Sequence, residues 1–306
     1  MKDRLRIVVA LGGNALLPRG AKPDAEPQRQ NVLRAAESIA ELARDHEVIV
    51  THGNGPQVGL LAMESAADPL LSRPYPLEAL DAETQGLIGY WLVQGLHNVL
   101  PGRSVAALLT QCVVRADDPA FSAPTKFVGP VYDEADARRL AHERGWSIAR
   151  DGDRWRRVVA SPEPTRIVEA DVVRKLTADD VIVVCAGGGG VPVTEDDSGC
   201  LHGVEAVIDK DLTAALLAET LDADLLLLLT DVPAVEIDHG RPGSQQIHDT
   251  TPSELRRFSF PPGSMGPKVD AVCRFVEHTG RRAAIGELTQ AAAILDGTAG
   301  TRVRPG

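Results

Sequence analysis

Two lysines in this sequence lie where chemistry on a phosphate group would need positive charge. Lys210 is flanked by Asp209 and Asp211 at the point where an apolar run gives way to a helical pattern. Lys268 follows the glycine-containing segment 263–267 in a similar position. Because the dipole of a helix disfavours a cation at its N-terminus unless an anion also binds there, both lysines are candidates for holding an anion. Taken singly, each could equally be an exposed lysine in the first turn of a helix.

Three glycine turns could supply the rest of an anion site. Each follows a short apolar run rich in β-branched residues, and the glycines are Gly12 and Gly13, Gly53 and Gly55, and Gly187, Gly188, Gly189 and Gly190. A strand that runs into glycine exposes backbone N–H groups and has no Cβ to keep an anion away. Three such turns in one chain predict a site where several backbone amides meet phosphate or carboxylate oxygens.

Other common catalytic motifs are absent from the sequence. It contains no G-x-x-x-x-G-K-[ST], no G-x-S-x-G and no H-E-x-x-H, and its eight histidines show no metal-ligand spacing. The segment 53–59 differs from a dinucleotide-binding fingerprint by one extra residue before its last glycine. A P-loop enzyme is therefore excluded, and a dinucleotide-dependent oxidoreductase is disfavoured.

Composition narrows the class of partner. The chain has 306 residues, 43% hydrophobic content and a net charge of −11, which argue against nucleic acid or an anionic membrane as the main partner. Its four cysteines form no C-x-x-C pair, which favours reduced thiols in a cytoplasmic protein over disulfides or zinc. Residues 1–17 read as a first strand and its turn rather than a signal peptide, and no apolar run is long enough for a membrane span.

The elements that must position these residues alternate between strand and helix patterns. Strands are predicted over 5–11, 48–51, 105–109, 181–185, 224–229, 282–285 and 300–303. Helices are predicted over 28–44, 56–67, 76–98, 209–221, 264–280 and 289–296. This rhythm predicts an α/β fold with a mostly parallel sheet covered by helices. Residues 111–168, rich in Pro, Asp and Trp, break the rhythm and predict an insertion or protruding subdomain that carries Lys126.

Together these motifs resemble the carbamate kinases of the amino acid kinase superfamily. The resemblance runs nearly end to end and is carried by the segments 12–15, 52–59, 85–90, 117–121, 124–126, 155–159, 187–193, 203–212, 230–232 and 263–269. It implies a three-layer αβα sandwich in a single domain of two lobes. Residues 1–200, including the subdomain at about 111–168, would hold carbamate or carbamoyl phosphate, and residues 201–306 would hold the nucleotide. It also implies a homodimer with ATP or ADP and Mg²⁺, in which no protein group ligates the metal directly.

The resemblance assigns roles to individual residues. The residues at the reacting groups would be Lys126, Lys210, Asp211 and Lys268, with Asp211 orienting the lysines rather than acting as a base. The carbamate side would use Gly12, Gly13, Asn14, Gly53, Asn54, Gly55 and Lys126. The nucleotide side would use Gly187, Gly188, Gly189, Gly190, Lys210, Thr230, Asp231, Val232, Met265 and Lys268. The implied activity is reversible phosphoryl transfer between ATP and carbamate, used in arginine or agmatine breakdown.

Two departures from the family pattern leave alternatives open. The family usually continues Pro-Ile-Gly-Pro-Phe-Tyr after Lys126, whereas this chain has Phe-Val-Gly-Pro-Val-Tyr, and the segment 233–240 lacks the tyrosines expected near adenine. A related kinase that phosphorylates a larger carboxylate is one alternative, although its usual lysine is replaced here by Asn14. A nucleotide sensor without turnover is another, since a fold alone does not establish a function.

Overall fold

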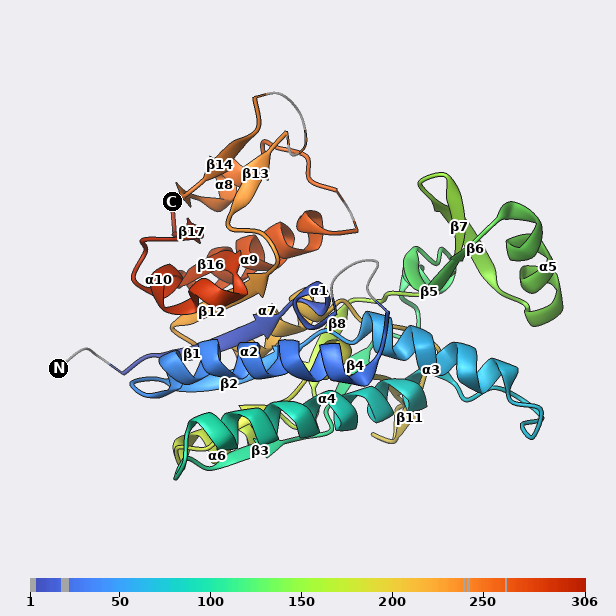
Figure 1. Cartoon of the computed structure of the whole chain (residues 1–306), viewed down its shortest axis with the longest axis horizontal. Coiled ribbons are helices and arrows are strands. Elements are labelled where there is room, and N and C mark those ends of the chain that lie inside the picture. Colours follow the sequence, from blue (N-terminus) through green and yellow to red (C-terminus); the bar gives the residue numbers. More distant parts are fainter. Residues whose placement is uncertain (1–3, 18–21, 239, 241–242, 262) are drawn as a thin grey trace.

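A central sheet of eight strands organises the protein (Figure 1). The structure is a computed structural model that describes residues 4–17, 22–238, 240, 243–261 and 263–306. The strand order is β15-β17-β16-β12-β1-β2-β9-β3, and all neighbours are parallel except β16 and β17. The bounds are β1 (Arg6–Leu11), β2 (Glu47–His52), β3 (Val105–Ala107), β9 (Ile182–Val184), β12 (Leu225–Thr230), β15 (Asp249–Thr250), β16 (Arg282–Glu287) and β17 (Thr301–Val303).

Helices cover both faces of this sheet, as the alternating pattern predicted. Their bounds are α1 (Gly13–Leu16), α2 (Ala25–Ala43), α3 (Gly55–Ala67), α4 (Leu77–Val99), α5 (Glu134–Arg144), α6 (Ala170–Ala178), α7 (Lys210–Thr220), α8 (Pro252–Leu255), α9 (Met265–Thr279) and α10 (Ala291–Leu295). Side chains alternate between the faces of β1, so that Val8 packs in the core under α7 and α9 and Val9 packs in the core under α2 and α4. The predicted αβα sandwich is confirmed. Within the described residues, no helix is both long and apolar enough to cross a membrane.

Parallel pairing brings the turns after three strands to one edge of the sheet. Leu11 at the end of β1 pairs with His52 of β2 and with Leu229 of β12. The glycine turns at 12–13 and 53–55 therefore lie beside the turn after Thr230, at the carboxyl ends where α/β sheets commonly bind ligands.

The irregular stretch 111–168 divides into two parts with different partners. Its ends, β4 (Gln111–Val114) and β8 (Pro164–Ile167), join β10 (Val191–Glu195) and β11 (Leu201–Gly203) in a sheet of order β11-β10-β4-β8. Its middle forms a separate antiparallel sheet of β5 (Lys126–Tyr132), β7 (Arg154–Val159) and β6 (Ser147–Asp151), which protrudes with α5 (Figure 1). A further hairpin joins β13 (Val235–Ile237) to β14 (Gln245–Ile247). The sequence did not indicate these short strands: β4 and β5 pair only with strands far along the chain, whereas β6 with β7 and β13 with β14 form local hairpins that were not recognised.

Local signals at the helix ends were mostly read correctly. Pro56 lies in the first turn of α3, and Gly280 ends α9 in the left-handed conformation with φ +66°. Asp209 caps α7 by accepting a hydrogen bond from the N–H of Asp211. Ser264 occupies the N-cap position of α9 as predicted, but its side chain makes no capping hydrogen bond.

The protruding unit, residues 126–159, is attached by a close backbone contact and an ion pair. A Cβ at Gly59 of α3 would lie 2.9 Å from the backbone of Gly129 in β5, so the contact requires a glycine at position 59. Arg157 in β7 donates to Glu205 at 2.9 Å, and the second oxygen of Glu205 accepts from the N–H of Leu77 at 2.8 Å. The protruding unit is thus held against both α3 and the start of α4.

We expect Gly59→Ala to loosen the protruding unit while the central sheet stays folded. Overpacking at this contact costs about 1–3 kcal/mol, which corresponds to roughly 5- to 150-fold faster tryptic cleavage between residues 126 and 159. Limited proteolysis with mass spectrometry measures this rate. Glu64→Ala, an exposed change on the same helix, is the matched control. Equal cleavage rates for the two variants would contradict the role of Gly59.

Candidate active site

Two lysines share one buried carboxylate at the sheet edge. Lys210 Nζ donates to Asp211 Oδ1 at 2.5 Å, and Lys268 Nζ donates to Asp211 Oδ2 at 3.1 Å. Only 5% of the Asp211 side chain is exposed, against 14% for Lys210 and 12% for Lys268. Both oxygens of Asp211 are therefore engaged, which suits an orienting role and leaves little basicity for proton abstraction.

The charges in this cluster hold one another ionised. Burial opposes ionisation of Asp211, but the two ammonium groups outweigh it and keep the pKa of this carboxyl well below its usual range. Burial also opposes the charge of Lys268, yet Asp211 raises the pKa of Lys268 above its ordinary value. For Lys210, burial lowers the pKa in spite of Asp211, and the nearby charge of Lys268 acts in the same direction. The cluster carries a net positive charge that a bound anion would stabilise.

A third lysine reaches the same region from the protruding unit. Lys126 lies at the start of β5, and its Nζ donates to Asp209 Oδ2 at 2.7 Å. The other oxygen of Asp209 accepts from the N–H of Asp211 at 2.9 Å. One carboxylate thus caps α7 and also holds a lysine that lies 83 residues away in the sequence.

The glycine turns pack closely beside these lysines. A Cβ at Gly53 would lie 2.9 Å from Gly13 N and 3.0 Å from Lys210 Cδ, so glycine is required there for the two turns and the lysine to meet. In contrast to the expectation from the sequence, the N–H groups of Gly12 and Gly53 are used within the sheet, since they donate to Leu229 O at 2.8 Å and Leu11 O at 3.0 Å. Gly13 and Gly55 are the first residues of α1 and α3. The N–H group of a first helical residue has no acceptor within its own helix.

Asn54, the residue between the two glycines of the second turn, is anchored on α4. Its Nδ2 donates to Asp81 and, at 2.8 Å, to Thr84 Oγ1, and Asn54 is only 2% exposed. Burial raises the pKa of Asp81 to about 7, although the hydrogen bond from Asn54 acts against this rise. Nearby, burial lowers the pKa of His52 to about 4, so this histidine is neutral at physiological pH.

Comparison with known proteins shows the family of this chain. Residues 5–287 match the amino acid kinase family. The chain is 53% identical to carbamate kinase of Rhizobium meliloti strain 1021 over 97% of this chain and 92% of the relative. It is 52% identical to carbamate kinase of Haemophilus influenzae over 98% and 96% of the two chains.

The chain belongs to the carbamate kinase family. Its fold agrees, because the structure of carbamate kinase from Giardia lamblia bound to AMP-PNP superposes with a TM-score of 0.91 over 100% of both chains, at 38% identity. As a member of this kinase family the protein is a phosphotransferase. The resemblance read from the sequence motifs is thereby confirmed at the level of family, fold and enzyme class.

The structure separates the residues expected at the nucleotide into two groups. Thr230 ends β12, Asp231 follows it and Met265 begins α9. The charge of Asp231 contributes to the raised pKa of Lys268. Val232 follows in the same turn and is half-buried. The second group, Gly187 to Gly190, is buried on the other side of β1 and β2 from β12 in the order of the sheet, because it follows β9. The loop nevertheless lies against the start of α7, because Thr213 Oγ1 donates to Gly189 O at 2.9 Å.

The loop Gly187–Gly190 is packed tightly against its neighbours. A Cβ at Gly188 would lie 2.3 Å from Asn54 Nδ2 and 2.6 Å from Asp81 Oδ1, and Gly188 has a φ of +68°. At Gly189, whose carbonyl accepts from Thr213 Oγ1, a Cβ would lie 2.7 Å from Ile208 O. The glycines are thus explained by close packing, and their contribution to nucleotide binding stays a prediction.

Two residues noted in the sequence lie wholly or partly outside the described structure. Asn14 lies in α1, but its side chain is outside the described part of the structure, as is the whole of His239.

Asp81 and Thr84 of the site were not identified from the sequence. The signal that could have found them is a pair of polar residues, three positions apart, on the buried face of α4.

We expect Asp211→Asn to destabilise the fold by about 3 kcal/mol, because two buried ammonium groups lose their shared carboxylate. Thermal unfolding with and without inorganic phosphate measures the effect. Phosphate should stabilise this variant more than the wild type, since an added anion replaces the missing charge. The control Asp171→Asn removes an exposed ion pair with Arg174 and should change stability by less than about 1 kcal/mol. Similar unfolding temperatures for both variants would contradict the importance of the cluster.

Proposed function

We propose that this protein transfers the γ-phosphoryl group of ATP to carbamate, giving ADP and carbamoyl phosphate, and also catalyses the reverse reaction. The observation that carries the proposal is the convergence of Lys126, Lys210 and Lys268 on two carboxylates at the sheet edge. Three ammonium groups in one place suit a reaction between two anions, where positioning and charge stabilisation supply most of the catalysis. The close relationship to carbamate kinases supports the choice of carbamate.

The proposed chemistry needs no general base. Carbamate is already an anion, so its oxygen attacks the γ-phosphorus directly while the oxygen that bridges the β- and γ-phosphates leaves on ADP. Lys210 and Lys268 stabilise the charge on the transferred group, and Asp211 keeps them in place. Lys126 exchanges its ion pair with Asp209 for the incoming carbamoyl phosphate. Gly13 and Gly55 offer N–H groups, and Gly12 and Gly53 provide the room for close approach.

Mg²⁺ is proposed as the companion of the nucleotide. In the described part of the chain no three His, Cys, Asp or Glu residues group into a metal site, and both oxygens of Asp211 already accept from lysines. This donor set fits a metal held by phosphate oxygens and water rather than by protein ligands. When bound, the ion would screen the negative charge of the β- and γ-phosphates. The nucleotide itself would lie on residues 201–306, against Thr230, Asp231, Val232, Met265 and Lys268, with Gly187 to Gly190 behind the reacting phosphates.

The proposed setting is the cytoplasm, where the enzyme would make ATP from carbamoyl phosphate released by arginine or agmatine breakdown. Three of the four cysteines, Cys112, Cys185 and Cys273, are buried and free, as expected in a reducing compartment. The acidic composition is compatible with a freely diffusing enzyme of small metabolites.

We expect Lys210→Ala to lower kcat by about 100-fold or more, the usual cost of removing one group that stabilises developing charge. The assay follows ATP formation from ADP, Mg²⁺ and fresh carbamoyl phosphate. Lys175→Ala, an exposed lysine on α6, is the control and should leave kcat unchanged. Turnover of Lys210→Ala close to that of the wild type would refute the assignment. If the folded wild type prefers a larger acyl phosphate, or turns over none, the related kinase or the sensor takes the place of this proposal.

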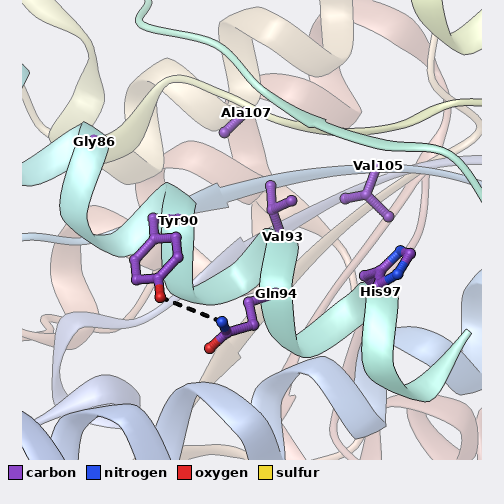
Figure 2. Close-up of a pocket in the computed structure, with 7 residues that line it drawn as sticks. All are labelled: Gly86, Tyr90, Val93, Gln94, His97, Val105 and Ala107. Carbon is purple, nitrogen blue, oxygen red and sulfur yellow. Dashed lines mark hydrogen bonds between the residues drawn. The ribbon is translucent and has the colours of Figure 1, made fainter.

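A homodimer formed through α4 and β3 is part of the proposal. β3 is an edge strand, and among the described residues no strand pairs with its outer side. Beside it lies a groove of about 500 Å³, shown in Figure 2, lined by Gly86, Tyr90, Val93, Gln94, His97, Val105 and Ala107. Tyr90 is 57% exposed, and Leu87 on the same helix and Leu109, just after β3, are also exposed. A second copy of the chain would cover the open edge and these apolar side chains at once.

We expect Tyr90→Arg to convert the dimer into a monomer, because a charge is introduced at the centre of an apolar contact. Light scattering after size exclusion measures the molar mass, which should fall from twice the 32.6 kDa of the chain to a single copy. Leu70→Arg, at a side chain that is 90% exposed and lies outside the groove, is the control and should remain dimeric. A Tyr90→Arg protein that stays dimeric would contradict this interface.

A further inference from the structure

The hydrogen-bond partners of the Asn54 side-chain amide fix its orientation. Thr84 Oγ1 donates its hydrogen to Asp81 O at 2.8 Å, so toward Asn54 this hydroxyl can only accept. The carboxyl oxygen of Asp81 accepts as well. Asn54 must therefore present its NH₂ group to α4, and its two N–H donors are used by Asp81 and Thr84.

The carbonyl oxygen of Asn54 is consequently turned away from α4. No residue in the described part of the chain donates a hydrogen bond to this oxygen. Asn54 follows Gly53, where an added Cβ would lie 2.9 Å from Gly13 N and 3.0 Å from Lys210 Cδ. Asn54 thus belongs to the turn at which the lysine cluster and the first glycine turn meet.

The site around this oxygen otherwise consists mainly of donors. Lys126, Lys210 and Lys268 carry N–H groups, and the two carboxylates nearby already accept from those lysines. Such donors suit the oxygens of carbamate and of phosphate. The amino group of carbamate, however, brings two N–H donors of its own and needs an acceptor.

We propose that Asp81 and Thr84 are positioning residues that aim the carbonyl oxygen of Asn54 at the amino group of carbamate. The pair thereby selects carbamoyl phosphate over acyl phosphates that carry a methyl group in place of the amino group. This inference rests on the proposed function and extends it to substrate selection. A polar group that is left unpaired when the wrong substrate binds is an effective basis for such discrimination.

The packing around the pair supports a fixed orientation. Gly188 lies so close to Asn54 Nδ2 and Asp81 Oδ1 that even a Cβ would overlap them, which leaves the amide no room to move toward the Gly187–Gly190 loop. Asp81 can act in either protonation state, because a protonated carboxyl still has a carbonyl oxygen that accepts from Asn54. Asp81→Asn offers the same kind of acceptor and is therefore the conservative variant, whereas Asp81→Leu removes it.

The test compares carbamoyl phosphate with acetyl phosphate, which replaces the amino group by a methyl group. The kcat/KM for carbamoyl phosphate with ADP and the inhibition constant of acetyl phosphate are measured for the wild type, Asp81→Leu and Asp81→Asn. We expect Asp81→Leu to lower kcat/KM for carbamoyl phosphate by about 10- to 100-fold while the inhibition constant of acetyl phosphate changes less than about threefold. Asp81→Asn should keep the wild-type ratio.

A second pair of variants guards against misfolding of Asp81→Leu. Thr84→Val has nearly the same shape but cannot accept from Asn54, and Thr84→Ser keeps the hydroxyl. Thr84→Val should shift the ratio in the same direction, and Thr84→Ser should not. If binding of acetyl phosphate weakened as much as kcat/KM for carbamoyl phosphate fell, the role of the pair would be merely structural. If neither quantity changed, Asp81 and Thr84 would not be needed to orient Asn54. Either result overturns the inference. A wild type without carbamoyl phosphate turnover would instead refute the proposed function, and this inference with it.

Discussion

The buried carboxylate of Asp211 between two ammonium groups is the interaction on which the rest of the site depends. Two lysines at helix starts would repel each other and the helix dipoles if they stood alone. Asp211 offsets that repulsion, keeps its own charge because of the two neighbours, and leaves the cluster one positive charge in excess. The cluster exists only because α7 and α9 begin at the same edge of a parallel sheet. The chain as a whole carries a net charge of −11, so this positive charge is a local feature of an acidic protein.

Each lysine in the site has a carboxylate partner in the protein. Asp211 holds Lys210 and Lys268, and Asp209 holds Lys126. These partners keep the ammonium groups satisfied before an anion arrives, which limits the cost of holding like charges close together. They also fix the lysine side chains at the sheet edge, so less conformational freedom would be lost on binding an anion there.

The protruding unit connects Lys126 to the helices α3 and α4. It supplies Lys126, rests on Gly59 of α3 through Gly129, and bonds through Arg157 to Glu205. Glu205 in turn binds the first N–H of α4, the helix that also carries Asp81 and Thr84. The residues that hold the protruding unit and those that orient Asn54 therefore share one rigid support.

The sequence by itself determined the local features of this protein. Apolar runs located the central strands, the pattern of Gly55, Pro56 and the following residues located α3, and Asp209 was identifiable as the start of α7, because each signal depends on residues within one or two turns. The motifs were also sufficient to indicate the family. Only the tertiary structure decided which distant residues meet. Lys126 and Asp209 are 83 positions apart, and Asp81 and Asn54 are 27 apart, so no local pattern records either contact. The same limit explains why the sequence suggested open anion-binding amides at Gly12 and Gly53. Their N–H groups are used by neighbouring strands, and strand order is set by the packing of the whole sheet rather than by the turns themselves.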